Sequence, residues 1–214
     1  MTKLHKKSLS KLSEKVLTSP YTAKASTSAK IHYVRGIKNS PSYDPSFDYW
    51  KGLRDKIKAT LKANSSLDEI VKYAATAGVR KSENYLRVAN KFRAFLKGKD
   101  YKYFETGHSA WNNSPDMSII SSPELGLIID GQRYFIKNYY KKKKSDEKVT
   151  QRYINSTLTL MQLAEPNFDT SNGIFAVLNL QNGKLIEQKP LIDDDIMAFK
   201  IDAATFADIW QRSL

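Results

Sequence analysis

The stretch "LGLIIDGQRYFIKNYYKKKK", residues 125–144, decides which fold the chain can adopt. Two apolar runs flank the dipeptide Asp130-Gly131. Asp-Gly between apolar runs is the strongest short-range signal for a two-residue hairpin turn, because both residues accept the positive φ that the turn requires. The stretch therefore predicts a β-hairpin whose second strand carries Lys137 and ends in a run of lysines.

Hydrophobic periodicity extends this prediction to the rest of the chain. Apolar residues spaced three or four apart indicate helices, and alternating or short apolar runs indicate strands. The expected helices lie at residues 47–61, 66–78, 82–98 and 148–164, and a last one is capped by Asp202. The expected strands lie at residues 117–121, 125–129, 132–140 and 196–201, with a second hairpin over 173–189 that turns at Asn182-Gly183. This order predicts an α+β fold, in which a mostly antiparallel sheet packs against N-terminal helices and a C-terminal helix.

The formal net charge is +13, and it is unevenly distributed. Residues 1–40 hold nine Lys or Arg against one acid, residues 41–149 hold 21 against 13, and residues 150–214 hold five against eight. A field of this kind attracts polyanions such as nucleic acid or anionic lipid. The alternative is that the surplus lysines only solvate the surface.

The N-terminal 40 residues differ in composition from the rest of the chain, being rich in Lys, Ser and Thr and poor in apolar residues. They predict a basic, mobile arm with at most a short helix near residues 9–17. Residues 41–214 are expected to form a single α+β domain, with a helical part at 41–100 and a part of sheet and helix at 115–214. The chain has no cysteine, which fits a cytoplasmic protein, and no apolar run approaches the ~18 residues of a membrane span.

Helix, strand hairpin, helix and strand follow one another over residues 82–180, and this order resembles the core of the PD-(D/E)xK nucleases. The resemblance implies a site for Mg²⁺ or Mn²⁺ in which an acid and a lysine stand two apart on one strand. Lys137 is the mid-strand lysine, but Phe135 stands where the acid is required. The acids that could serve a divergent enzyme are Asp116, Glu124 and Asp130. Without the acid beside Lys137, a correct fold match would imply a binding protein or a degenerate member of the family.

Residues 71–92 resemble a DNA-binding helix-turn-helix in part. Ala74, Gly78 and Val79 occupy its small, turn and buried positions, but Asn84 falls where the second helix needs a buried residue. An ordinary helical corner explains the same residues. The histidines are far apart in the chain and show no metal-ligand spacing, and the acidic run 193–195 is read as a charged loop or helix cap.

The sequence as a whole favours a non-catalytic protein that binds nucleic acid or another polyanion. The rivals are a divergent metal-dependent nuclease and a protein-interaction module, such as an inhibitor or antitoxin, that binds an acidic partner. No cofactor is expected apart from the metal ion of the nuclease alternative. The residues expected to contact nucleic acid are Arg80, Lys81, Arg87, Lys91, Lys141, Lys142, Lys143 and Lys144.

Overall fold

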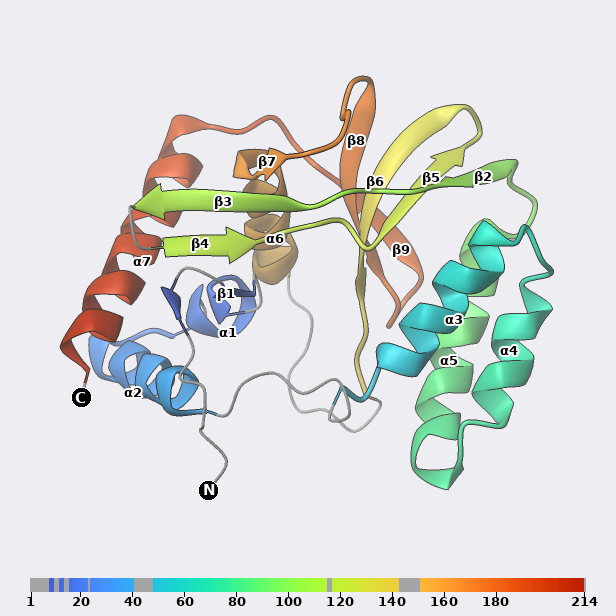
Figure 1. Ribbon diagram of the computed structural model, residues 1–214, viewed down its shortest axis with the longest axis horizontal. Helices are drawn as coiled ribbons and strands as arrows, with labels where there is room; N and C mark the ends of the chain where they lie inside the picture. The colour runs from blue at the N-terminus through green and yellow to red at the C-terminus, as the bar shows by residue number, and fades with distance from the viewer. Residues whose placement is uncertain are drawn as a thin grey trace.

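The structure is a computed structural model, and it describes residues 8–9, 12–13, 16–22, 24–40, 48–114, 117–142 and 151–213. It confirms the α+β fold, with helices packed on two mostly antiparallel sheets and a long helix near the C-terminal end (Figure 1). None of the helices in these ranges is long and apolar enough to cross a bilayer. The predicted site residues Asp116, Lys143 and Lys144 lie outside the described residues.

The predicted 125–140 hairpin forms the centre of a five-stranded sheet. In spatial order the strands are β2 (Tyr101–Phe104), β5 (Leu125–Ile129), β6 (Gln132–Tyr139), β8 (Gly173–Asn179) and β9 (Lys184–Glu187). Only β6 and β8 are parallel neighbours in this sheet. Asp130 and Gly131 adopt φ values of 49° and 83°, as the two-residue turn requires. Both predicted hairpins, β5–β6 and β8–β9, are therefore confirmed, whereas the sequence pattern does not predict β2.

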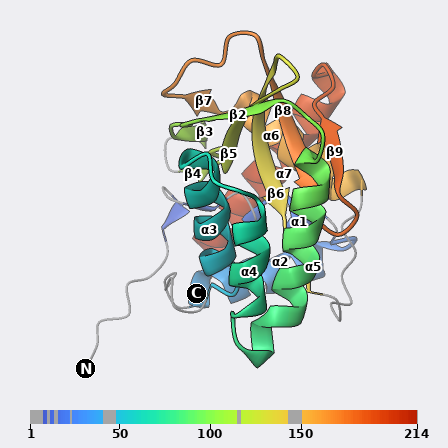
Figure 2. The same cartoon turned by 90° about the vertical axis from the view of Figure 1, so that its right-hand side faces the viewer.

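Three helices cover one face of this sheet, and they lie side by side in Figure 2. They are α3 (Lys51–Lys62), α4 (Asp68–Ala75) and α5 (Val79–Leu96). Apolar residues three or four apart on each helix meet the sheet in one core, to which Ile57, Phe92 and Leu127 contribute fully buried side chains. The three predicted helices are confirmed, although α5 begins three residues earlier than expected, directly after Gly78 with its φ of 79°.

The helix α6 (Gln151–Leu163) connects the parallel strands β6 and β8 and packs on the opposite face of the sheet. Ile154 and Leu158 of α6 contact Val177 of β8, whereas the neighbours Ala176 and Leu178 face the α3–α5 core. Alternate residues of a strand point to opposite faces, so β8 is buried on both sides. Parallel strands need such a crossover, and a helix is its usual form.

A second sheet of four strands stands beside the first. Its spatial order is β1 (Leu12–Ser13), β4 (Met117–Ile120), β3 (Ser109–Ser114) and β7 (Glu165–Pro166). The strands β3 and β4 are inserted in the chain between β2 and β5, and Trp111, Met117 and Ile119 face a second core. Leu160 and Ala164, in and just after α6, belong to this core as well, so α6 joins the two halves of the molecule.

Over the ranges described, the N-terminal residues pack on other parts of the protein. Residues 27–39 form the helix α2 (Thr27–Asn39), which follows the short α1 (Ser19–Thr22) and packs on α7 (Asp193–Arg212) (Figure 1). Val34 is fully buried, and Lys38 donates hydrogen bonds to the carbonyl oxygens of Trp210 and Ser213 at 2.9 and 2.5 Å. In the stretch expected to hold a short helix, Leu12 and Ser13 pair with β4 as a strand. The sequence alone does not reveal the contact between α2 and α7, because the partner of α2 lies about 170 residues further along the chain.

The C-terminal segment is one continuous helix of 20 residues, α7, and the predicted strand at 196–201 is wrong. Asp202 lies inside this helix and does not cap it; its carboxylate pairs with Lys30 at 2.6 Å. The acidic run 193–195 forms the first turn, where the helix dipole stabilises negative charge. The short apolar run over 196–201, in which Lys200 is the one polar residue, resembles a strand, but Phe199, Ala203 and Phe206 continue the helical spacing into the second core.

Candidate functional site

Two separate elements supply the cations that the sequence assigns to nucleic-acid binding. Arg80, Lys81, Arg87 and Lys91 lie on α5, and Lys141 and Lys142 follow β6 after Tyr140. The Arg87 guanidinium donates a hydrogen bond to the carbonyl oxygen of Lys141, which ties the two elements together across 54 residues of chain. We refer to the six cations Arg80, Lys81, Arg87, Lys91, Lys141 and Lys142 as the basic surface.

Tyr49, just before α3, is the centre of this arrangement. The ammonium group of Lys142 lies 4.1 Å from the centroid of the Tyr49 ring, and that of Lys81 lies 5.6 Å from it. The negative face of an aromatic ring attracts cations at such distances. Both lysines are therefore held over one ring, although they are 61 positions apart in the sequence.

Hydrogen bonds and ring contacts fix the position of Tyr49. Its hydroxyl donates to the carbonyl oxygen of Arg80 at 3.0 Å and accepts from the side-chain amide of Asn84 at 3.2 Å. Its ring packs edge-on against Trp50 and Tyr85, with centroids 4.9 and 5.8 Å away. Sequence reasoning misses Tyr49 because nothing local indicates that the residues before α3 contact α5. The one hint is that Tyr49 belongs to the aromatic stretch at the start of the first predicted helix, 47–61.

The basic surface differs from the rest of the helical layer in its ion pairs. On α3, α4 and the outer side of α5, cations pair with carboxylates, as in Lys56–Glu69 at 2.8 Å and Arg93–Asp68 at 2.6 Å. Among the described residues, Arg80, Lys81, Arg87, Lys91 and Lys142 have no carboxylate within 4 Å. Clustered cations without counter-charges raise the local positive potential and repel one another, so an anion bound there is stabilised.

The arrangement of cations along α5 suits a chain of anionic groups. Arg80, Arg87 and Lys91 are spaced seven and four residues apart, so they line one side of the helix over about three turns. Lys91 lies at the far end of this line, beside the β8–β9 turn, where it approaches Gly183. The surface is therefore elongated along the helix, as the backbone of a nucleic acid is.

The helix-turn-helix resemblance fails at one of its defining positions. Gly78 does stand at the corner between α4 and α5, but Val79, which the motif would bury, is 97% exposed. Asn84, at the position that needs a buried apolar residue, is partly buried and bonded to Tyr49. The residues form an ordinary helical corner.

The residues proposed for a nuclease are only partly brought together. Glu124 and Lys137 are neighbours: the Glu124 N–H donates to the Ile136 carbonyl at 2.8 Å at the end of the β5–β6 ladder. Lys137 donates to the Ser122 carbonyl at 2.5 Å. Asp130 lies at the opposite end of the same hairpin, where its carboxylate accepts the N–H of Asp100 at 3.0 Å. In the described part of the chain, no three His, Asp or Glu side chains come together to hold a metal ion.

Phe135 occupies the strand position at which the nuclease motif needs an acid. Its side chain is fully buried, and its ring lies 5.3 to 5.5 Å from those of Phe104, Phe168 and Phe175. The Gly173 backbone lies so close to this ring that a Cβ at that position would collide with it. An aromatic cluster thus fills the space where a carboxylate would have to meet a metal ion.

Glu124 instead belongs to a polar network under α3. Its carboxylate accepts hydrogen bonds from the Asn138 side-chain amide at 2.8 Å and from the Tyr140 hydroxyl. Burial raises the pKa of Glu124 above its ordinary value, and these hydrogen bonds with the charges of Arg54 and Lys137 only partly oppose that shift. The Tyr140 ring also stacks on Trp50 at 5.4 Å, so the network supports the aromatic group that holds Tyr49.

The raised pKa of Glu124 predicts a pH-dependent stability. The unfolded chain has a glutamate pKa of ~4.3, so the folded state binds the proton more tightly and gains stability as the pH falls through the folded pKa. Glu124→Gln keeps an oxygen acceptor for Asn138 and Tyr140 but cannot titrate. We expect the free energy of unfolding of the natural protein, relative to this variant, to rise between pH 8 and pH 4 in urea titrations. A difference that stays constant over this range would contradict a buried carboxylate.

Comparison of the chain with protein-family models, with curated protein sequences and with solved structures gives no match.

Proposed function

We propose that the protein binds nucleic acid without cleaving it and without reading its sequence, through contacts of the basic surface with phosphates. One observation carries the proposal: Lys81 and Lys142, brought from distant parts of the chain, are held over one tyrosine ring with no carboxylate partner among the described residues. If these lysines served only to keep the protein in solution, bringing their charges together would give no advantage, because like charges repel.

The geometry favours phosphates over bases as the groups contacted. The Tyr49 ring already faces two ammonium groups and packs against neighbouring rings, so it orients cations and does not offer an open platform for a stacked base. Lysine and arginine contacts to phosphate position a protein on nucleic acid but carry no sequence information. A cysteine-free chain is compatible with the cytoplasm, where such ligands are abundant.

The missing acid supports a non-catalytic role. Lys137 donates to a backbone carbonyl and Phe135 fills the position of the required carboxylate. Glu124 is the one proposed acid beside Lys137 in the described residues, and it is engaged by Asn138 and Tyr140. No feature of the described residues specifically favours the enzyme or the protein-interaction module over nucleic-acid binding.

The test is binding to labelled single- and double-stranded DNA and RNA across a salt series, with EDTA, Mg²⁺ or Mn²⁺ present. For about three to five phosphate contacts, log K should fall with log[salt] at a slope of about −3 to −5, and the nucleic acid should remain intact. Polyglutamate serves as a competitor, because its charges have the same sign as phosphates but a different spacing. Stronger binding to polyglutamate than to nucleic acid would favour an acidic protein partner. EDTA-sensitive cleavage, or no binding at ~50 mM salt where electrostatic contacts are strong, would reject the proposal.

A further inference from the structure

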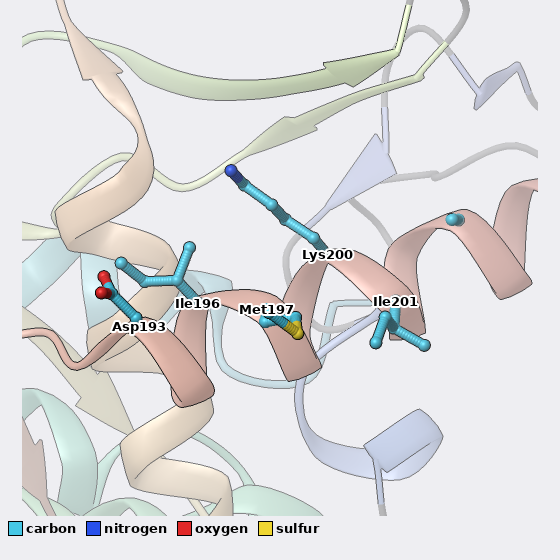
Figure 3. Close-up of a pocket in the computed structure, with 6 residues that line it drawn as sticks. Asp193, Ile196, Met197, Lys200 and Ile201 are labelled. Atoms are coloured by element: carbon cyan, nitrogen blue, oxygen red, sulfur yellow. The ribbon is translucent and has the colours of Figure 1, made fainter.

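The outward side of α7 carries apolar residues that nothing in the described part of the chain covers. Ile192 at its start is 57% exposed, and Met197 and Ile201 are each 59% exposed. The inward side of the same helix is buried in the second core through Phe199 and Phe206. A shallow hollow of about 420 Å³ lies along this stretch and is lined by Asp193, Ile196, Met197, Lys200, Ile201 and Ala204 (Figure 3).

These residues follow one another in a self-complementary order. Read from the N-terminal end of the stretch, Ile192-Asp193 is followed by Ile196-Met197 and then by Lys200-Ile201. In either direction the order of these six residues is apolar, charged, apolar, apolar, charged, apolar. Reversing the direction exchanges the positions of aspartate and lysine. Two copies of this stretch laid antiparallel, with Ile196 and Met197 nearest the two-fold axis, would therefore place Asp193 of each copy opposite Lys200 of the other.

The directions of the two charged side chains agree with this pairing. Asp193, Ile196 and Lys200 project from one side of α7, Ile201 from the other, and Met197 lies between them (Figure 3). In an antiparallel pair of identical helices, one flank of a helix contacts the same flank of its partner. A charged side chain on that flank therefore meets the opposite charge only when the opposite charge lies at the same distance on the other side of the two-fold axis. A two-fold contact requires such reciprocity, since residue i contacts j and j contacts i.

We propose that a second copy of this chain covers the hollow, and that the protein forms a two-fold dimer through antiparallel packing of α7. Charge favours this surface over others for self-association. Residues 150–214 hold five cations against eight acids, whereas the rest of the chain is strongly basic. The basic surface on α5 lies at the opposite end of the molecule's long axis, so the two positive regions stay far apart in the dimer (Figure 1).

The charges also argue against other occupants. An anionic membrane would repel Asp193, Asp194 and Asp195 at the start of the exposed stretch. The stretch covers about three helical turns, which is short for a stable interface, so we expect a dissociation constant on the order of 10–100 µM. This inference does not depend on the proposed function.

Sedimentation velocity of the full chain from 5 to 500 µM, in Mg²⁺-free buffer without nucleic acid, tests the dimer. The natural protein should pass from monomer to dimer across this range. Lys200→Asp and Asp193→Lys should each weaken association at least tenfold, because each faces like charges across the two-fold axis. The double variant, which exchanges the two charges, should restore association to within about threefold of the natural protein.

Two further variants guard against a fold defect. Gln211→Glu places a charge on the same helix beyond the apolar stretch and should leave association unchanged. Met197→Cys introduces the only cysteine of the chain beside the two-fold axis, and mild oxidation should link two copies, whereas cysteine at the exposed Lys72 should not. Circular dichroism and melting temperature verify that each variant folds. A natural protein that stays monomeric at 500 µM, or a folded double variant that does not regain association, would overturn the inference.

Discussion

Replacing Phe135 with aspartate should leave the protein unfolded at 25 °C, although the substitution creates the nuclease motif Asp-x-Lys in β6. The side chain is buried among three other aromatic rings, those of Phe104, Phe168 and Phe175. Truncating a buried phenylalanine costs about 3–5 kcal/mol, and an unpaired buried carboxylate adds several more. A domain with ~5–15 kcal/mol of stability has little left after that loss. Far-UV circular dichroism and urea unfolding measure the effect.

Two companion variants separate packing from charge. Phe135→Leu keeps an apolar side chain and should cost about 1–2 kcal/mol, since part of the cavity remains filled. Lys102→Asp places the same acid at an exposed position of the same sheet, on β2, and should change stability by less than about 0.5 kcal/mol. A folded Phe135→Asp protein that cleaves DNA with Mg²⁺ would show that the chain is one substitution away from the enzyme, and the binding proposal would then need revision.

The double variant Lys81→Glu/Lys142→Glu should lower nucleic-acid affinity about 100-fold at ~100 mM salt and reduce the salt slope by about 2. Both ammonium groups lie over Tyr49, so reversing their charge removes two phosphate contacts and places carboxylates at the centre of the basic surface. Fluorescence anisotropy across the salt series used for the natural protein measures both quantities. The affinity should fall for every sequence tested, because phosphate contacts do not discriminate between bases.

A matched variant distinguishes a site from a general charge effect. Lys102→Glu/Lys189→Glu changes the net charge by the same amount at exposed positions that lie outside the basic surface. It should weaken binding only severalfold, through the long-range field alone. Equal losses of affinity in the two double variants would mean that nucleic acid binds through the overall positive charge. The position of Lys81 and Lys142 over Tyr49 would then make no specific contribution to binding.

Local signals predict the parts of this fold that are local in space. The β5–β6 and β8–β9 hairpins follow from their turn dipeptides, and α3 to α5 follow from the spacing of apolar residues. The strand β3 pairs with its neighbour β4, but its sequence SAWNNS holds two apolar residues and gives no clear strand pattern. The strand β2 is not predicted because it is short and pairs with β5, which lies more than 20 residues further along the chain. The same reason hides the α2–α7 contact, so that a Lys- and Ser-rich segment looks like an arm when read alone.

The candidate site divides in the same way. Composition identifies the cations of α5 and of the lysine run, because charge is visible in any sequence. Composition does not reveal that Arg87 donates a hydrogen bond to Lys141, or that Lys81 and Lys142 both lie over the Tyr49 ring. Both contacts depend on how α3, α5 and β6 pack. The order of helices and strands resembles a nuclease core, yet Phe135 shows that a shared order of elements does not bring the chemistry with it.

The contact between α2 and α7 has a consequence for how the protein emerges from the ribosome. Lys30 and Lys38 bond to groups 172 residues later in the chain, and Val34 is buried in the second core, to which α7 contributes Phe199, Ala203 and Phe206. At ~5–20 residues per second, α2 waits roughly 10–30 s for its partner to be made. During that interval its apolar side is uncovered in a strongly basic nascent chain, next to ribosomal RNA. Chaperone capture of the growing chain, and rapid degradation of any product that stops before α7, are the cellular behaviour to expect from a fold that is closed by its last helix.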